Sequence, residues 1–274
     1  MNRDALKEYF TRDLQWDWDH QGRLVFDFLC EAAAEARGGV VLDAGAGHQR
    51  YRPFFEDCMY LAQEHPVAGV ENKGIRKYDI LCDVKNIPLR DNSVDVVLST
   101  SSLEHVREPE AFFRESFRVL APGGSLRINV PFVYLEHETP FDFQRPTRYG
   151  LKRWYEDAGF ERVEVRPSSS SIFPALYFLK EAMLEERQRC RAPLRRLALS
   201  IARHAASPFC ACLRRIFDRG PHPDTKFPVG WIAAGCKKGP HAKRDLAGVP
   251  AAEFLKQNAI PGAVFDGNSL VYNG

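Results

Sequence analysis

The stretch from residue 137 to residue 150, HETPFDFQRPTRYG, gathers several side chains that can do chemistry. A histidine can take a proton near neutral pH, Glu138 and Asp142 can bind a cation or a hydroxyl group, and Arg145 can clamp an anion. Four interpretations are open. The stretch is a metal site, an acid/base apparatus, a polar clamp for a substrate, or a loop closed by its own salt bridge.

The metal interpretation needs more ligands than the stretch supplies. His137, Glu138 and Asp142 are the candidates, and no second histidine accompanies them. We therefore predict no metal and favour the polar clamp, in which Glu138, Asp142 and Arg145 hold hydroxyl, amine or carboxylate groups. The alternative is an internal salt bridge between Asp142 and a neighbouring arginine.

A glycine-rich turn follows the run VVLDAGAG at residues 40–47. A short apolar run that ends in an acid and two glycines is typical of a buried parallel strand turning sharply into a ligand-binding loop. A dinucleotide fingerprint needs a third glycine. The residues after Gly47 are His48-Gln49-Arg50, so the spacing argues against NAD.

The glycine turn and the polar stretch must be positioned by alternating strands and helices. Residues 21–37 place apolar side chains on one helical face, and EPEAFFRESFRVLAPGG reads as a helix ended by Pro-Gly-Gly. This alternation predicts a parallel sheet that is covered on both faces. Further apolar runs predict strands at residues 59–64, 78–83, 94–100, 125–131 and 229–237.

Composition narrows the functional classes. The chain has 274 residues, a formal charge of +2 and 27% charged residues, which argues against a general nucleic-acid binder. Its seven cysteines are odd in number and scattered, as in proteins with reduced thiols. The N-terminus has no apolar signal-peptide core, and no apolar run is long enough to span a membrane. We predict a cytoplasmic protein.

The order of these motifs resembles the class I S-adenosylmethionine-dependent methyltransferases, specifically the type 11 group. The resemblance rests on VVLDAGAGHQRY, YLAQE, DILCDVKNIPLRDNSVDVVLSTSSLEHV and FRVLAPGGSLRINVP. It implies an α/β, Rossmann-like, doubly wound sheet of seven mostly parallel strands. The expected divisions are an N-terminal helical lid (1–37), a cofactor-binding core (38–171), a basic helical insertion (172–222), a last core strand (223–239) and a loosely packed C-terminal tail (240–274).

The resemblance also implies the cofactor, S-adenosylmethionine, and its site. Glu64 would accept the ribose hydroxyls, Asp83 would face the adenine amine, and Asp43 would orient the glycine loop through its amides. Asp43 as a loop cap and Asp83 as a turn former are the structural alternatives. The implied cofactor-binding residues are Asp43, Ala44, Gly45, Ala46, Gly47, Glu64, Asp83, Val84, Ser99 and Thr100.

A methyltransferase acting on a hydroxyl group needs a proton acceptor beside the sulfonium. His137 and His105, in SSLEHV, are the candidates, and His105 as a loop anchor is the alternative. Tyr51 joins Glu138, Asp142 and Arg145 as a substrate contact. We expect O-methylation of a small polar or sugar-like molecule. The alternatives are N-methylation of a small amine and a catalytically silent scaffold that binds the cofactor. Trp16 and Trp18 would close over the site.

The segment from residue 174 to residue 219 has ten Lys/Arg against four Asp/Glu. Its two helical stretches predict a solvated cap, a dimer surface or a peripheral contact with an anionic membrane, possibilities that the sequence leaves open together with the oligomeric state. No nucleic-acid partner is expected.

Overall fold

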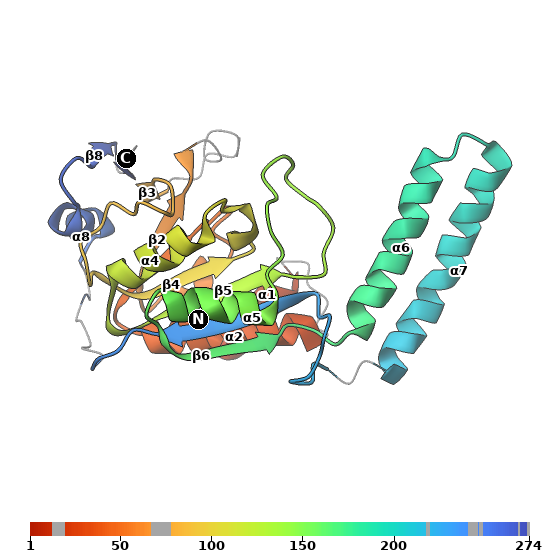
Figure 1. The fold of residues 1–274 in the computed structure, drawn as a ribbon, viewed down its shortest axis with the longest axis horizontal. Coiled ribbons are helices and arrows are strands. Elements are labelled where there is room, and N and C mark those ends of the chain that lie inside the picture. Colours follow the sequence, from red (N-terminus) through yellow and green to blue (C-terminus); the bar gives the residue numbers. More distant parts are fainter. Residues whose placement is uncertain are drawn as a thin grey trace.

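The computed structural model describes residues 1–12, 20–66, 78–217, 220–240, 246, 249–267 and 269–272. One central sheet carries helices on both faces (Figure 1). The strands are β1 (Val40–Ala44), β2 (Met59–Glu64), β3 (Ile80–Leu81), β4 (Val94–Thr100), β5 (Leu120–Pro131), β6 (Glu161–Pro167), β7 (Gly230–Cys236), β8 (Val264–Asp266) and β9 (Ser269–Val271). The helices are α1 (Arg3–Arg12), α2 (His20–Ala36), η1 (Arg52–Phe55), η2 (Leu103–His105), α4 (Pro109–Val119), α5 (Arg148–Asp157), α6 (Ile172–Arg189), α7 (Pro193–Phe217) and α8 (Ala251–Asn258).

The strand order is β6-β7-β5-β4-β1-β2-β3-β9-β8. Strands β5, β4, β1, β2 and β3 are parallel, so their carboxyl ends meet at one edge of the sheet. The chain moves from β1 outward to β2 and β3, and then returns to place β4 on the other side of β1. Ligands of open α/β sheets bind outside the strand ends at such a switch point.

Two apolar clusters hold the helices to the sheet. Helices α4, α5 and α8 contribute to the cluster on one face, and α1, α2 and η1 to the cluster on the other. All five residues of β1 and all seven of β4 are buried, as expected for central strands covered on both sides. Helix α5 begins at a Thr147 cap, whose side chain accepts a hydrogen bond from the Gly150 amide at 3.1 Å.

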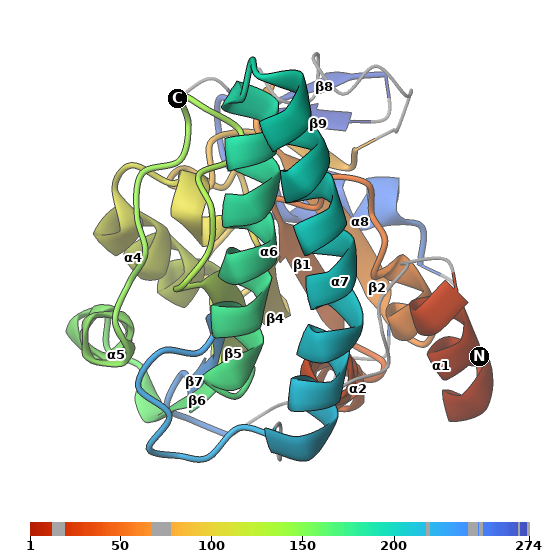
Figure 2. The ribbon, with the colours of Figure 1, turned by 90° about the vertical axis from the view of Figure 1, so that its right-hand side faces the viewer.

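Helices α6 and α7 form an antiparallel hairpin that projects from the sheet (Figures 1 and 2). The arrowheads of β4 and β5 point toward the side on which the hairpin stands (Figure 1). In the described part of the chain, no helix is both long enough and apolar enough to cross a lipid bilayer.

The structure differs from the sequence-based expectation at both ends of the chain. The sheet has nine strands, not seven, because the tail adds β9 beside β3 and β8 beyond it. The tail is not loosely packed over its described residues, since Phe254, Leu255 and Leu270 are buried in the core. Helix α2 packs on the sheet as part of the core. The expected lid residues Trp16 and Trp18 lie outside the described residues.

Candidate functional site

The glycine loop after β1 is held by the end of β2. The Gly45 amide donates to Gln63 Oε1 at 3.0 Å, and the Gly47 amide donates to Glu64 Oε2 at 2.9 Å. Both glycines have positive φ angles, of 79° and 49°, which residues with a Cβ rarely adopt. The loop path is therefore fixed by side chains of the neighbouring strand. The sequence analysis did not single out Gln63.

Asp43 does not orient the loop amides as expected. Its fully buried carboxylate accepts a hydrogen bond from the Tyr60 hydroxyl, and the loop amides are taken by Gln63 and Glu64 instead. Burial raises the pKa of Asp43 to about 7, against the lowering effect of the Tyr60 hydrogen bond. Asp43 therefore contacts Tyr60 of the neighbouring strand β2 and not the amides of the glycine loop.

The Asp43→Asn variant is expected to gain stability relative to wild type as the pH rises from 5 to 8. The folded-state pKa of Asp43 lies above the unfolded value of about 3.9, so the unfolded chain releases its proton first. The contribution to stability is present below pH 4 and is lost as the pH rises toward 7. Urea unfolding at pH 5 and pH 8 measures it. An unchanged difference between the two proteins would contradict a raised pKa.

The other strand ends carry the remaining expected cofactor residues. Glu64, Ser99 and Thr100 are buried at the carboxyl ends of β2 and β4. Asp83 Oδ1 accepts a hydrogen bond from the Lys85 amide at 3.0 Å, so Asp83 forms a local turn, and its contact with the adenine amine stays a prediction. Burial raises the pKa of the Tyr51 hydroxyl to about 12. Tyr51 lies in the segment between the glycine loop and η1.

The turn after β4 lies against the glycine loop. A Cβ built on Gly45 would be 2.0 Å from Ser102 Oγ, so the two turns are in direct contact at this point. Helix η2 begins one residue after Ser102 and ends with His105. The candidate proton acceptor His105 is therefore three residues after Ser102, which contacts the glycine loop.

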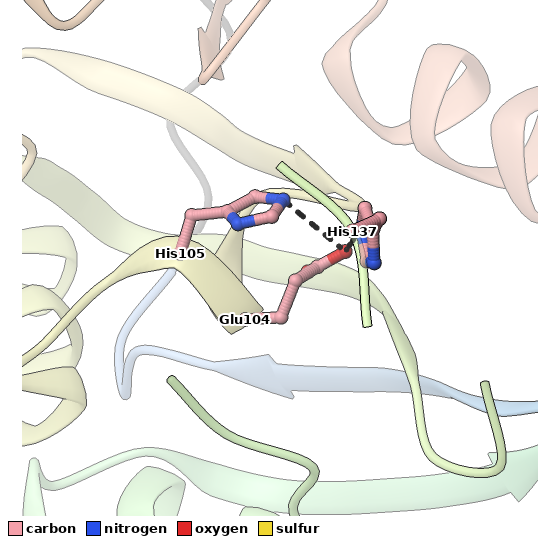
Figure 3. Close-up of side chains that lie close together, drawn as sticks. All are labelled: Glu104, His105 and His137. Carbon is pink, nitrogen blue, oxygen red and sulfur yellow. Dashed lines mark ion pairs between the residues drawn. The ribbon is translucent and has the colours of Figure 1, made fainter. Parts of the chain in front are cut away.

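His105 and His137 are brought together by the fold. Their ring centroids lie 4.9 Å apart in an edge-to-face arrangement. His137 comes from the loop that follows β5, and His105 from η2. The Glu104 carboxylate points at both rings, with its Oε1 3.6 Å from His137 Nε2 and 3.9 Å from His105 Nε2 (Figure 3).

Glu104, like Gln63, is a site residue that the sequence analysis missed. Its side chain is fully buried, and neither carboxylate oxygen accepts a hydrogen bond from another residue that the structure describes. Burial raises its pKa to about 8, and the charge of Arg145 opposes that shift. The signal available in the sequence was an acidic residue between apolar Leu103 and the candidate His105.

The polar stretch at residues 137–150 is held by hydrogen bonds and a salt bridge between its own residues. Arg145 Nη2 donates to Asp142 Oδ2 at 2.6 Å, and the His137 amide donates to the same oxygen at 3.0 Å. The alternative of an internal Asp142–Arg145 salt bridge is thus confirmed, and Arg145 also holds the pKa of Asp142 down at about 2. Two of the three side chains of the expected clamp, Asp142 and Arg145, are thus engaged within the loop. Glu138 is the exposed member, 3.6 Å from His105 Nε2.

The loop is also fastened to η2. Gln144 Nε2 donates to the carbonyl oxygens of Leu103 and Val106 at 2.9 and 2.8 Å. The Phe143 amide donates to the Glu104 carbonyl oxygen at 2.9 Å. His105 Nδ1 lies 2.8 Å from the Phe141 carbonyl oxygen, so the ring anchors the loop, which was the alternative to a role as proton acceptor. These bonds set the positions of the two histidines.

Comparison with known proteins finds similarity to methyltransferases. Residues 42–128 match the family model described as "Methyltransferase domain". The arsenite methyltransferase of Halobacterium salinarum is 30% identical over 170 residues, which are 51% of this chain and 41% of that protein. An uncharacterized methyltransferase of Mycobacteroides abscessus is 34% identical over 131 residues, covering 44% and 49%. The matched part of the chain thus spans less than half of either relative.

A crystal structure of an S-adenosylmethionine-dependent methyltransferase from Thermotoga maritima has a similar fold. The two superpose with a TM-score of 0.50 at 15% sequence identity, over 86% of this chain and all of that one. At this identity the similarity concerns the fold alone.

Proposed function

We propose that the chain transfers the methyl group of S-adenosylmethionine, because residues 42–128 match the family model described as "Methyltransferase domain" and lie in an open, mostly parallel α/β sheet. The acceptor is an oxygen of a small polar molecule. The observation that carries the choice of oxygen is the histidine pair, whose Nε2 atoms converge beside the turn that contacts the glycine loop. A hydroxyl nucleophile must lose its proton, and imidazole accepts one near neutral pH.

The glycine loop fits the proposed cofactor. A Cβ built on Gly47 would meet no atom within 4 Å, so open space borders the loop there. Two acids, Glu64 and Asp83, stand at the ends of the neighbouring strands, where a ribose diol and an adenine amine need acceptors. S-adenosylmethionine supplies the electrophilic methyl group. The chain's own residues bind it, orient it and exclude water.

The transfer is a displacement at the methyl carbon. The acceptor oxygen forms a bond to that carbon, the carbon–sulfur bond breaks with its electron pair going to sulfur, and the hydroxyl proton moves to the histidine pair. Glu138 is exposed beside His105 and offers a contact to the acceptor. Alignment within the braced loop supplies most of the rate.

Gly47→Ala is expected to weaken binding of S-adenosylhomocysteine by at least about tenfold, equivalent to about 1.4 kcal/mol. The added methyl group would enter the space assigned to the cofactor. Gly267→Ala is the matched control, because Gly267 also has positive φ and open space around it, but it lies in the β8–β9 turn. Calorimetric titration measures both variants against wild type. No binding to folded wild type would overturn the proposed function.

Acceptor chemistry is tested with labelled S-adenosylmethionine. Pairs of small acceptors that differ only in a hydroxyl or an amine group are compared for methyl incorporation. We expect the hydroxyl compounds to be methylated, and His105→Gln with His137→Gln to lower that rate while S-adenosylhomocysteine still binds. Faster transfer to the amines would replace oxygen by nitrogen as the acceptor atom.

We further propose that the α6–α7 hairpin contacts an anionic lipid surface. Exposed apolar side chains line one side of α7 at helical spacings. They are Leu194, Leu197, Ile201, Phe209 and Ile216. The sequence of α7 contains arginines and no acidic residue, so stacking two copies along α7 would bring like charges together, whereas an anionic bilayer neutralises them. Tyr134, which contacts His137, stacks on Tyr177 of α6 and links the hairpin to the site.

Arg195→Glu with Arg196→Glu is expected to lower co-sedimentation with phosphatidylserine-containing vesicles at least tenfold, since each basic residue near the surface contributes about 1 kcal/mol. Arg37→Glu with Arg153→Glu, which are exposed charges outside the hairpin, is the control. Equal loss in both pairs, or no vesicle binding at low salt, would sink the proposal. A dimer that Leu197→Asp dissociates, without lipid binding, would identify a second copy as the occupant.

A further inference from the structure

Three potential metal ligands converge where η2 meets the loop after β5. One ligand atom each from Glu104, His105 and His137 lies within 4.8 Å of the other two. Figure 3 shows the carboxylate directed at both rings. The residues come from segments more than 30 positions apart, and the hydrogen bonds of Gln144 and Phe143 hold those segments together. The cluster is therefore built by the fold and not by local sequence.

The two rings are held with the same nitrogen toward Glu104. His105 Nδ1 lies 2.8 Å from the Phe141 carbonyl oxygen, and His137 Nδ1 lies 3.1 Å from the Leu135 carbonyl oxygen. A carbonyl oxygen only accepts, so these two contacts favour the tautomers in which Nδ1 carries the proton and Nε2 keeps a lone pair. Arg145 Nη2 also lies 3.4 Å from His137 Nδ1. Metal-binding histidines are commonly oriented in this way, through a hydrogen bond from the other ring nitrogen.

Three acceptors therefore face one another. Both Nε2 atoms and the Glu104 carboxylate offer lone pairs, and among the described residues no other side chain or amide donates to that carboxylate. The distances of 3.6 and 3.9 Å from Oε1 to the two rings are too long for a shared hydrogen bond. A fully buried carboxylate that accepts no hydrogen bond from another residue is costly unless it takes up a proton or a cation neutralises it.

We propose that Glu104, His105 and His137 bind a divalent transition-metal cation. Two imidazoles and one carboxylate form a ligand set known from zinc and non-haem iron sites that keep positions open for water or substrate. With bonds of about 2.1 Å, adjacent ligand atoms lie about 3.0–3.4 Å apart. The Oε1–Nε2 distances of 3.6 and 3.9 Å therefore need to shorten by about 0.2–0.9 Å, and any ligand atoms that lie as far as 4.8 Å apart need to move further. The exposed Glu138 carboxylate, with Oε2 3.6 Å from His105 Nε2, offers a further oxygen ligand.

The metal site deepens the proposed function, and its catalytic role rests on that function being correct. An acceptor hydroxyl that occupies the open position has its pKa lowered by the cation. Its proton then leaves to solvent, the oxygen forms its bond to the methyl carbon, and the carbon–sulfur pair goes to sulfur. With the cation bound, the histidines act as its ligands and no longer as the proton acceptor, and the cation selects acceptors that offer a hydroxyl group.

The test is titration of Mn²⁺ and Zn²⁺ into chelator-treated full-length protein without a polyhistidine tag. Mn²⁺ matters because it disfavours the thiols of the seven cysteines. We expect one Mn²⁺ per chain, and at least about 100-fold weaker binding in Glu104→Gln and in His137→Gln. His222→Gln, an exposed histidine near Asp224, is the control and should bind as wild type does.

Two further readouts separate ligation from a structural role. Mn²⁺ should raise the unfolding temperature of wild type and not that of Glu104→Gln, while the metal-free variant should be no less stable than metal-free wild type. S-adenosylhomocysteine should bind both proteins, so loss of that binding reports on the proposed function and not on the metal. Millimolar or absent Mn²⁺ and Zn²⁺ binding, or binding that Glu104→Gln leaves intact, overturns the site.

Discussion

Replacing Gly45 by alanine should destabilise the chain by about 2–4 kcal/mol and lower its affinity for S-adenosylhomocysteine at least 100-fold. The new Cβ would stand 2.0 Å from Ser102 Oγ and 2.7 Å from Ser102 Cβ. The overpacking costs about 1–3 kcal/mol, and the φ angle of 79° adds about 1 kcal/mol for a residue with a Cβ. Because the same loop carries the proposed cofactor site, strain and lost binding should appear together. Urea unfolding and calorimetry measure them.

A second substitution separates the two causes. Ser102→Gly removes both atoms that the new Cβ would meet, so Gly45→Ala with Ser102→Gly should recover the overpacking part and keep the backbone strain. Gly47→Ala, which carries only backbone strain, is the reference for that remainder. If Gly45→Ala unfolds at the same urea concentration as wild type, the contact between the two turns is absent in solution.

Replacing Trp231 by alanine should destabilise the chain by about 3–5 kcal/mol, the usual cost of deleting a buried tryptophan. The indole is 2% exposed, packs with Phe132 at 5.4 Å between ring centroids, and donates from Nε1 to the Pro146 carbonyl oxygen at 3.0 Å. Phe132 and Pro146 stand at the two ends of the loop that carries His137. The variant should therefore also expose this loop to limited proteolysis.

Two variants test this explanation. Trp231→Phe keeps most of the apolar area but leaves the Pro146 carbonyl oxygen without its donor, so it should cost about 1–2 kcal/mol and raise proteolysis less. Trp154→Ala is the matched control, since that indole is half-buried and its Nε1 donates to the exposed Glu110 side chain at 3.1 Å. A cost as large for Trp154→Ala as for Trp231→Ala would contradict a specific role for Trp231.

Local patterns were sufficient to predict most of the core. The run VVLDAGAG became β1 and its glycine turn, and the helix ended by Pro-Gly-Gly became α4 and the start of β5. Apolar periodicity and turn residues act over a few positions, so they can be recognised without knowing the rest of the fold. The strand predicted at residues 78–83 became the two-residue β3. The short strands β8 and β9 escaped detection because three residues carry no periodicity.

The site was predictable only in part, because its chemistry depends on partners far apart in the chain. His105 and His137 were identified by residue type, but Glu104 was not, because an acid before a histidine has no distinctive meaning in sequence. Burial and the missing donor make it a site residue. Asp142 and Arg145, by contrast, were predicted to contact the substrate, but in the structure they form an ion pair with each other inside the loop.

The sequence by itself determined the Rossmann-like order of strands and helices, the glycine turn and the edge of the sheet where ligands bind. These features follow from hydrophobic period, turn chemistry and the shared direction of parallel strands, all of which are written locally. Only the tertiary structure decided that Gln63 and Glu64 hold the loop, and that Glu104 meets both histidines. Such contacts depend on how buried polar groups across distant segments satisfy, or fail to satisfy, one another.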